Sequence, residues 1–171
     1  MNHPEVETTH VGQQLGYSAH THLKMLVTSA LSLRRKVFLM GFELRFPLNM
    51  APPNDDGTLA RFLASLDLKC GPGGLDLDPS HAWLRVQDGA HPKYRCALLL
   101  DGDRLGSVYG AQVIVQEMWN LALGLPRDPN YGLAGHGFVG SDGIRREGGV
   151  MLWRDDYLFE DKLKDCLDWM S

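Results

Sequence analysis

The sequence predicts a single α+β domain, in which helices alternate with strands of an antiparallel sheet. Two observations lead to this prediction: four segments repeat apolar residues at helical spacing, and two strand-like runs follow each other across a slightly long hairpin loop. At 171 residues, with 44% hydrophobic and 22% charged residues, the chain suits one ordinary globular core. We therefore expect a loose polar arm over residues 1–17 and one folded domain over residues 18–171.

The four helical segments differ in how clearly their ends are marked. In the first, from about Ser18, Leu23, Val27 and Leu31 share one face, and the basic run 34–36 suits the negative end of the helix dipole. Apolar spacing and end signals place the others near 59–70, 109–123 and 155–170. The last is expected to start at the acidic pair 155–156.

The strands are predicted from alternation and from apolar runs. They are expected at 37–46, 82–87, 94–100, 137–139 and 150–153. In the first strand Glu43 and Arg45 fall on the face opposite the apolar residues, which are Phe38, Met40, Phe42 and Leu44. The second and third strands form a hairpin with a loop over 88–93.

Without the first and last helices, the element order is β-α-β-β-α-β, the split βαβ or ferredoxin-like arrangement. We expect its helices to cover one face of the sheet, with Leu98 and Leu100 beneath them, and the other face to be open to a ligand or nucleic acid. The order follows from periodicity alone.

Composition excludes several classes of protein. No stretch approaches the ~20 apolar residues of a membrane span, and the start lacks a signal pattern. The cysteines are Cys70, Cys96 and Cys166, an odd and unclustered set typical of reduced thiols in the cytoplasm. The net charge of -4 disfavours a generally basic nucleic-acid binder, although the acidity is concentrated in the last third of the chain.

Residues 82–102 (AWLRVQDGAHPKYRCALLLDG) are the most informative stretch. With LMGFELRFPL at 39–48 and VQEMWNLALGL at 115–125, they resemble the YagK/YfjJ-type replication-protein family of filamentous phages (inoviruses) and their prophages. The resemblance extends over most of the chain from about Ser18. In that family the second hairpin strand carries a His-Tyr-His element, similar to the metal-binding element of HUH-type rolling-circle initiators, whose ferredoxin-like domain nicks single-stranded DNA with a tyrosine. The resemblance implies DNA replication as the function and single-stranded or origin DNA as the partner.

This sequence departs from that pattern, because Lys93-Tyr94-Arg95 stands where the family has His-Tyr-His. Protonated lysine and arginine have no lone pair for a metal, so no cofactor is expected there. Residues 93 and 95 share one face of a strand, where two positive charges suit a phosphate. With Arg45 and Arg85 they are the candidate DNA-binding residues, and Tyr94 or Trp83 could stack on bases if either turns outward.

The nicking tyrosine of the resembling initiators lies on a helix over the open sheet face. Here the last helical segment holds only Tyr157, at its very start, and Tyr109 starts the third. These two are the candidates for a catalytic residue; otherwise the nucleophile is absent or lies beyond Ser171. The sequence leaves open whether the chain is an enzyme.

Three hypotheses for the function follow. The first is a replication-initiator-like, DNA-binding protein with impaired or absent nicking. The second is a single-strand endonuclease that holds Mg²⁺ or Mn²⁺ at a rebuilt site, with Glu43, His91 and Asp101 as candidate ligands. The third, consistent with the acidity, is a protein-interaction module without nucleic acid. The oligomeric state is not predicted.

Overall fold

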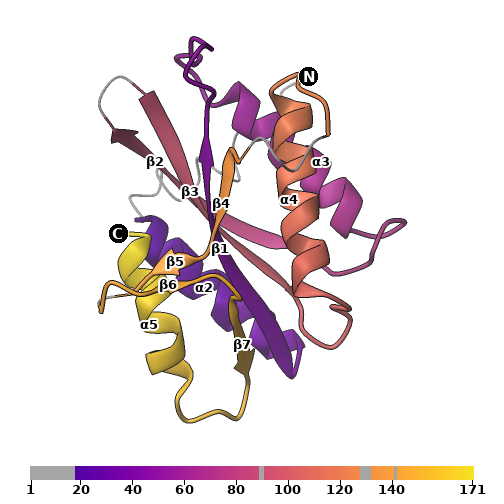
Figure 1. The fold of residues 1–171 in the computed structure, drawn as a ribbon. Helices are drawn as coiled ribbons and strands as arrows, with labels where there is room; N and C mark the ends of the chain where they lie inside the picture. The colour runs from indigo at the N-terminus through magenta and orange to yellow at the C-terminus, as the bar shows by residue number, and fades with distance from the viewer. Residues whose placement is uncertain (1–17, 89–90, 128–131, 141) are drawn as a thin grey trace, which may run out of the picture.

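The computed structural model describes residues 18–88, 91–127, 132–140 and 142–171, and confirms an α+β architecture (Figure 1). In chain order its elements are α2 (Ala19–Leu33), β1 (Lys36–Arg45), α3 (Gly57–Cys70), β2 (Ser80–Asp88), β3 (His91–Asp101), α4 (Val108–Ala122), β4 (Ala134–His136), β5 (Phe138–Val139), β6 (Arg145–Arg146), β7 (Val150–Trp153) and α5 (Phe159–Trp169). The expected arm over residues 1–17 lies outside the described residues.

The main sheet has five antiparallel strands in the order β2-β3-β1-β4, and β7 pairs with the other end of the same edge of β1. The connection β1-α3-β2-β3-α4-β4 follows the predicted β-α-β-β-α-β order. The strand expected at 137–139 is β5, however, which pairs with β6 in a separate two-stranded sheet, and β4 takes its place in the main sheet. Pairing of β2 with β3 continues to Asp88 and His91, so the loop expected over 88–93 is shorter than predicted. The polar ends of these strands have no apolar alternation, and the sequence pattern therefore missed them.

One face of the sheet packs against α3 and α4, and its composition agrees with the prediction. The sheet residues buried there include Phe38, Met40, Phe42, Leu44, Leu98 and Leu100. Phe62 of α3 meets the Phe42 and Trp119 rings edge to face, with centroids 6.0 and 5.7 Å apart. This face forms the larger core of the molecule.

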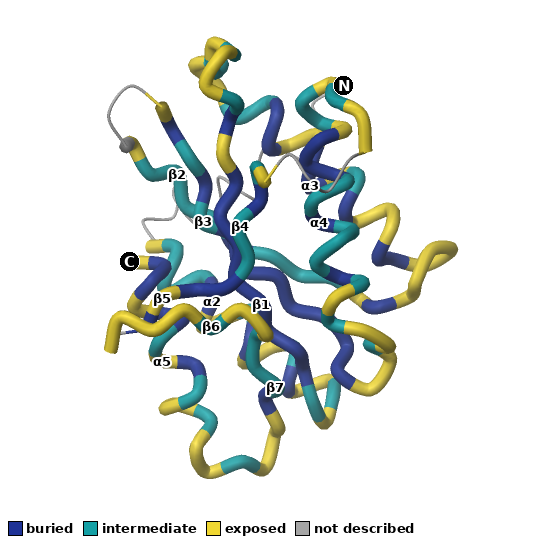
Figure 2. The backbone as a smooth tube through the Cα atoms, viewed as in Figure 1, coloured by how far each residue is buried: buried dark blue, intermediate teal, exposed yellow. Residues whose placement is uncertain are grey.

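The other face is not open, and the expectation that helices cover only one face is wrong. Helices α2 and α5 pack on it (Figure 1), where Leu23 and Leu163 meet strand residues such as Leu39 and Leu99. Figure 2 shows the central strands buried over most of their length. The cause lies in the sequence: residues 37–40 and 97–100 are continuous apolar runs, which place apolar side chains on both faces of a strand.

Gly41 of β1 brings the end of α5 close to the sheet. A Cβ atom at this position would lie 3.0 Å from the Phe138 ring and 3.2 Å from the Trp169 ring. Glycine therefore leaves the space in which both aromatic side chains pack. As a result, the last turn of α5 lies close to the end of this sheet face where Arg95 stands.

The remaining expectations concern the chain end, the cysteines and membrane spans. Helix α5 begins at Phe159, later than predicted, because Asp156 accepts a hydrogen bond from the Leu158 N–H and forms a turn there. Cys70, Cys96 and Cys166 are buried and unpaired. Within the described residues, no helix combines the length and apolar character needed to cross a bilayer.

Candidate functional site

The candidate site lies at the polar end of the sheet face that α2 and α5 cover elsewhere. Pairing of β1 with β3 sets Glu43 opposite Arg95 and Arg45 opposite Lys93. Because residues two apart on a strand share a face, all four side chains lie on the same side of the sheet. We call Arg45, Lys93 and Arg95 the cation cluster, with Glu43 at its centre.

Glu43 is a buried carboxylate that holds two of the cations in place. Its Oε1 accepts hydrogen bonds from Arg45 Nε (3.0 Å) and Nη2 (2.7 Å), and Lys93 Nζ lies 3.3 Å from Oε2. Burial opposes ionisation, but the Arg45 hydrogen bonds and the Lys93 charge outweigh it, so the pKa of Glu43 lies below its ordinary value. Glu43 is therefore ionised at neutral pH and fixes the spacing of Arg45 and Lys93.

Arg95 joins the cluster through the end of α5. Its Nη1 donates a hydrogen bond of 2.9 Å to the Trp169 carbonyl, and its guanidinium carbon lies 5.6 Å from the centre of the indole ring. The carbonyl end of a helix favours such a cation. Arg95 Nε is buried and has no hydrogen-bond partner among the described residues. The hydrogen bond and the ring contact therefore hold the Arg95 guanidinium against the end of α5.

The structure places Trp169 over a part of the sheet face that was expected to be open. Trp169 is nearly buried and packs against both Gly41 and Arg95. The sequence pattern gave little signal for this role, because Trp169 lies beside the apolar stripe of α5 and reaches the site only through the fold. The Trp169 indole has an N–H group that can donate a hydrogen bond, but the side chain has no oxygen that could act as a nucleophile.

Arg85, Tyr94 and Trp83 do not belong to the cluster, which corrects the prediction for Arg85. Arg85 pairs with Tyr94 across the hairpin, on the face covered by α3 and α4. Arg85 Nη1 and the Tyr94 hydroxyl both donate to Asp56 Oδ1, over 2.9 and 2.7 Å. Burial, together with Asp56, raises the pKa of Tyr94. Tyr94 is fully buried, and the partly buried Trp83 packs edge to face on it, so both rings lie on the sheet face opposite the cluster.

The two candidate catalytic tyrosines lie away from the cluster. Tyr157 is 91% exposed and precedes the first turn of α5, whereas Trp169 ends that helix about 15 Å further along its axis. Tyr109 is 73% exposed in the first turn of α4, which packs on the opposite sheet face. Neither tyrosine is placed to attack a molecule bound by Arg95.

The three residues expected to rebuild a metal site are also far apart. His91 and Asp101 are the two ends of β3, about 33 Å from each other at strand spacing. Glu43 contacts Arg45 and Lys93, and Asp101 accepts a hydrogen bond of 2.8 Å from Arg34. No group of three or more potential metal-ligating side chains occurs in the part of the chain that the structure describes. A metal ion shared by this trio is therefore incompatible with the fold.

The donors and charges of the cluster are those that an anion would require. Arg45, Lys93 and Arg95 provide only hydrogen-bond donors, and with Glu43 they leave a local excess of two positive charges. Comparison of the chain with protein-family models, with curated proteins and with solved structures gives no match in any of the three.

Proposed function

We propose that this chain is a replication-initiator-like domain of phage or prophage type that binds single-stranded DNA through the cation cluster without nicking it. The convergence of Arg45, Lys93 and Arg95 on one sheet face is the observation that carries the proposal. Each can donate to a phosphate oxygen, and arginine can do so with two parallel hydrogen bonds. The local charge is positive although the whole chain has a net charge of -4.

The topology supports a ferredoxin-like assignment. The strand order β2-β3-β1-β4, with α3 and α4 on one face, is that of a split βαβ fold. Lys93 and Arg95 lie on the central strand β3, and the resemblance implies that they replace the two histidines of the family's His-Tyr-His element. In this proposal, the part of the strand that binds a metal ion in the resembling initiators contacts a phosphate in this chain. The resemblance and the three free cysteines favour a cytoplasmic setting.

Two features support the absence of nicking. Lysine and arginine cannot supply lone pairs to a divalent metal. The helix that lies over this part of the sheet presents Trp169, which has no hydroxyl to attack a phosphodiester. A bound strand would therefore be held and not cut.

The exposure of the cluster indicates how DNA approaches. The Arg45 side chain is 57% exposed, whereas that of Lys93 is 19% exposed. A phosphate would meet Arg45 first and then Lys93 and Arg95 deeper in the site. Several backbone contacts would be needed for measurable affinity, since each phosphate contact contributes modestly.

The proposal is tested by fluorescence anisotropy with a labelled oligonucleotide at low salt. Replacing Lys93 and Arg95 together by glutamine should weaken binding by about tenfold or more. In the matched control, glutamine replaces Lys24 and Lys69, two exposed lysines on α2 and α3. This control loses as much positive charge as the Lys93/Arg95 variant. It should bind within about twofold of the wild type. Equal affinities of wild type and the Lys93/Arg95 variant, or no binding by the wild type, would overturn the proposal.

Nicking is tested separately, by incubating the same oligonucleotide with the protein and Mn²⁺ or Mg²⁺. We expect neither a cleaved product nor a covalent protein–DNA adduct. Cleavage would favour the metal-dependent endonuclease instead, and an adduct would show that a nucleophile acts at a site other than the one described.

A further inference from the structure

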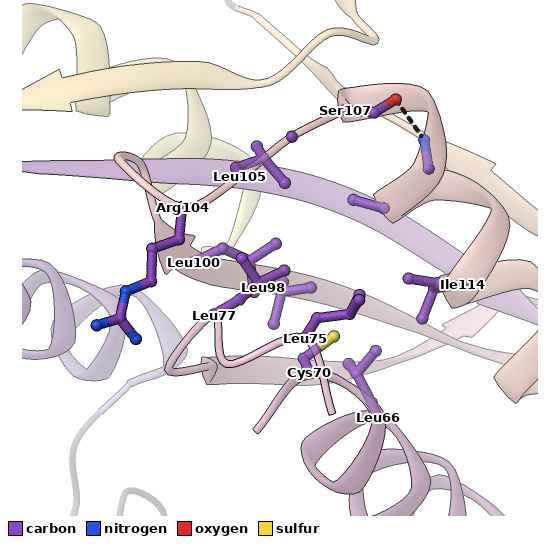
Figure 3. Close-up of a pocket in the computed structure, with 13 residues that line it drawn as sticks. Leu66, Cys70, Leu75, Leu77, Leu98, Leu100, Arg104, Leu105, Ser107 and Ile114 are labelled. Atoms are coloured by element: carbon purple, nitrogen blue, oxygen red, sulfur yellow. Dashed lines mark hydrogen bonds between the residues drawn. The ribbon is translucent and has the colours of Figure 1, made fainter. Parts of the chain in front are cut away.

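A large apolar cavity lies on the opposite face of the sheet, between α3, α4 and β3 (Figure 3). Its volume is about 450 Å³, within the range of pockets that bind small molecules. Leu98 and Leu100 of β3 form its floor, and Leu66 and Ile114 line its walls from α3 and α4. Both floor residues are almost fully buried, so the cavity reaches the core.

The loop over residues 71–79 closes one side of this cavity with Leu75 and Leu77. Two residues of the loop, Asp76 and Asp78, have left-handed backbone conformations with φ of 53° and 46°. Such conformations cost free energy in residues other than glycine and persist only where surrounding contacts hold them.

Ion pairs and backbone hydrogen bonds supply those contacts, among them the bonds from the Leu77 N–H to the Cys70 carbonyl and from the Asp101 N–H to the Leu77 carbonyl. Arg104 pairs with Asp76, and Arg34 pairs with Asp78, so each left-handed aspartate is tied to the body of the protein. The loop therefore covers an apolar space and is held there by two charge pairs and by backbone hydrogen bonds.

The charged side chains around the cavity determine which kind of ligand it can bind. Arg104 also lies 3.5 Å from Asp101, which accepts a 2.8 Å hydrogen bond from Arg34. Two arginines thus face three aspartates, leaving no excess positive charge for an anionic group. Figure 3 shows the Arg104 guanidinium directed away from the leucine side chains. The lining favours a ligand that is apolar and uncharged.

We propose that this cavity is a binding site for a small uncharged apolar molecule and that residues 71–79 are its movable cover. The site is on the opposite sheet face from the cation cluster, and the proposal does not depend on DNA binding. Entry would require the Arg104–Asp76 pair, which is exposed on both sides and weak, to open, together with the partly buried Arg34–Asp78 pair and the backbone hydrogen bonds of the loop.

The uncharged fluorophore N-phenyl-1-naphthylamine provides the first test. Its fluorescence should rise and saturate at one molecule per wild-type protein. Ile114→Trp fills the cavity and should weaken this binding by about tenfold or more. Leu121→Trp, an exposed position of the same helix that does not line the cavity, should bind within about twofold of the wild type.

Thermal unfolding of both variants establishes that they are folded before the titration. If Ile114→Trp loses its cooperative transition, Gly110→Leu, which adds a side chain beside the cavity from the same helix, replaces it. Absence of saturable binding by the wild type overturns the proposal, as does equal binding by a folded cavity-filling variant.

Cys70 tests the cover, because its thiol lines the cavity and is buried. Asp76→Asn, which weakens the Arg104 pair, should raise the rate of Cys70 alkylation by N-ethylmaleimide about threefold or more, and the fluorophore should suppress it. Asp142→Asn, which weakens an exposed ion pair elsewhere, should leave the rate unchanged. Equal rates in the two variants, read by mass spectrometry, contradict a movable cover.

Discussion

At the scale of single residues, Glu43 organises the candidate site. Considered from sequence as a metal ligand, this carboxylate instead holds Arg45 and Lys93 on the sheet face beside Arg95. Alternation within one strand was sufficient to place Lys93 and Arg95 on a common face. The sheet face on which Arg85 lies depends on the register in which the two strands of the hairpin pair. This register cannot be deduced from the alternation within one strand.

The lowered pKa of Glu43 predicts how stability changes with pH. Since the folded-state pKa is below the unfolded value, the unfolded chain binds a proton more readily as the pH falls. The stabilisation from Glu43 is complete above about pH 4.5 and is lost as the pH falls through the folded-state pKa. Glu43→Gln should therefore show a smaller loss of stability between pH 6 and 3 than the wild type, in urea unfolding at several pH values. Parallel curves for the two proteins would contradict this role.

At the scale of elements, the main correction concerns the two faces of the sheet. The strands, the helices on one face and their order were predictable, because their amphipathic periods are strong. Coverage of the other face was missed, although residues 37–40 and 97–100 carried a signal for it. Continuous apolar runs in strands require a second layer, and α2 and α5 provide it.

This two-sided packing predicts similar costs for substitutions on both faces. Phe42→Ala, beneath α3 and α4, should cost about 3–5 kcal/mol, and Leu39→Ala, beneath α2 and α5, about 2–5 kcal/mol. Leu68→Ala, at a side chain that is 77% exposed, should cost less than about 0.5 kcal/mol. Chemical denaturation measures all three. A cost for Leu39→Ala as small as that for Leu68→Ala would mean that the second face is open after all.

Close packing at Gly41 gives another prediction for this layer. Gly41→Ala would force the new Cβ against Phe138 and Trp169 and should cost about 1–3 kcal/mol. Gly135→Ala, on neighbouring β4, places its Cβ no closer than 4.0 Å to another part of the chain, and its cost should be smaller. Thermal unfolding distinguishes the two. Equal melting temperatures would show that α5 does not press on the sheet at this position.

At the scale of the whole molecule, a net charge of -4 coexists with a compact basic site. Charge counted along the sequence could not show this, because Arg45 and Lys93 meet only through the pairing of β1 with β3. Trp169 was likewise unpredictable as a partner of Arg95, since it depends on the placement of α5. The apolar cavity lies on the other side of the sheet, so the molecule has two distinct candidate sites.

The most direct test of phosphate binding by the cation cluster is the salt dependence of affinity for single-stranded DNA. Each phosphate contact adds about 0.7 to the slope of log affinity against log salt. Replacing Lys93 and Arg95 together by glutamine should therefore flatten the slope by about 1.4, while the control at Lys24 and Lys69 keeps the wild-type slope. Identical slopes for the wild type and the Lys93/Arg95 variant would contradict the account.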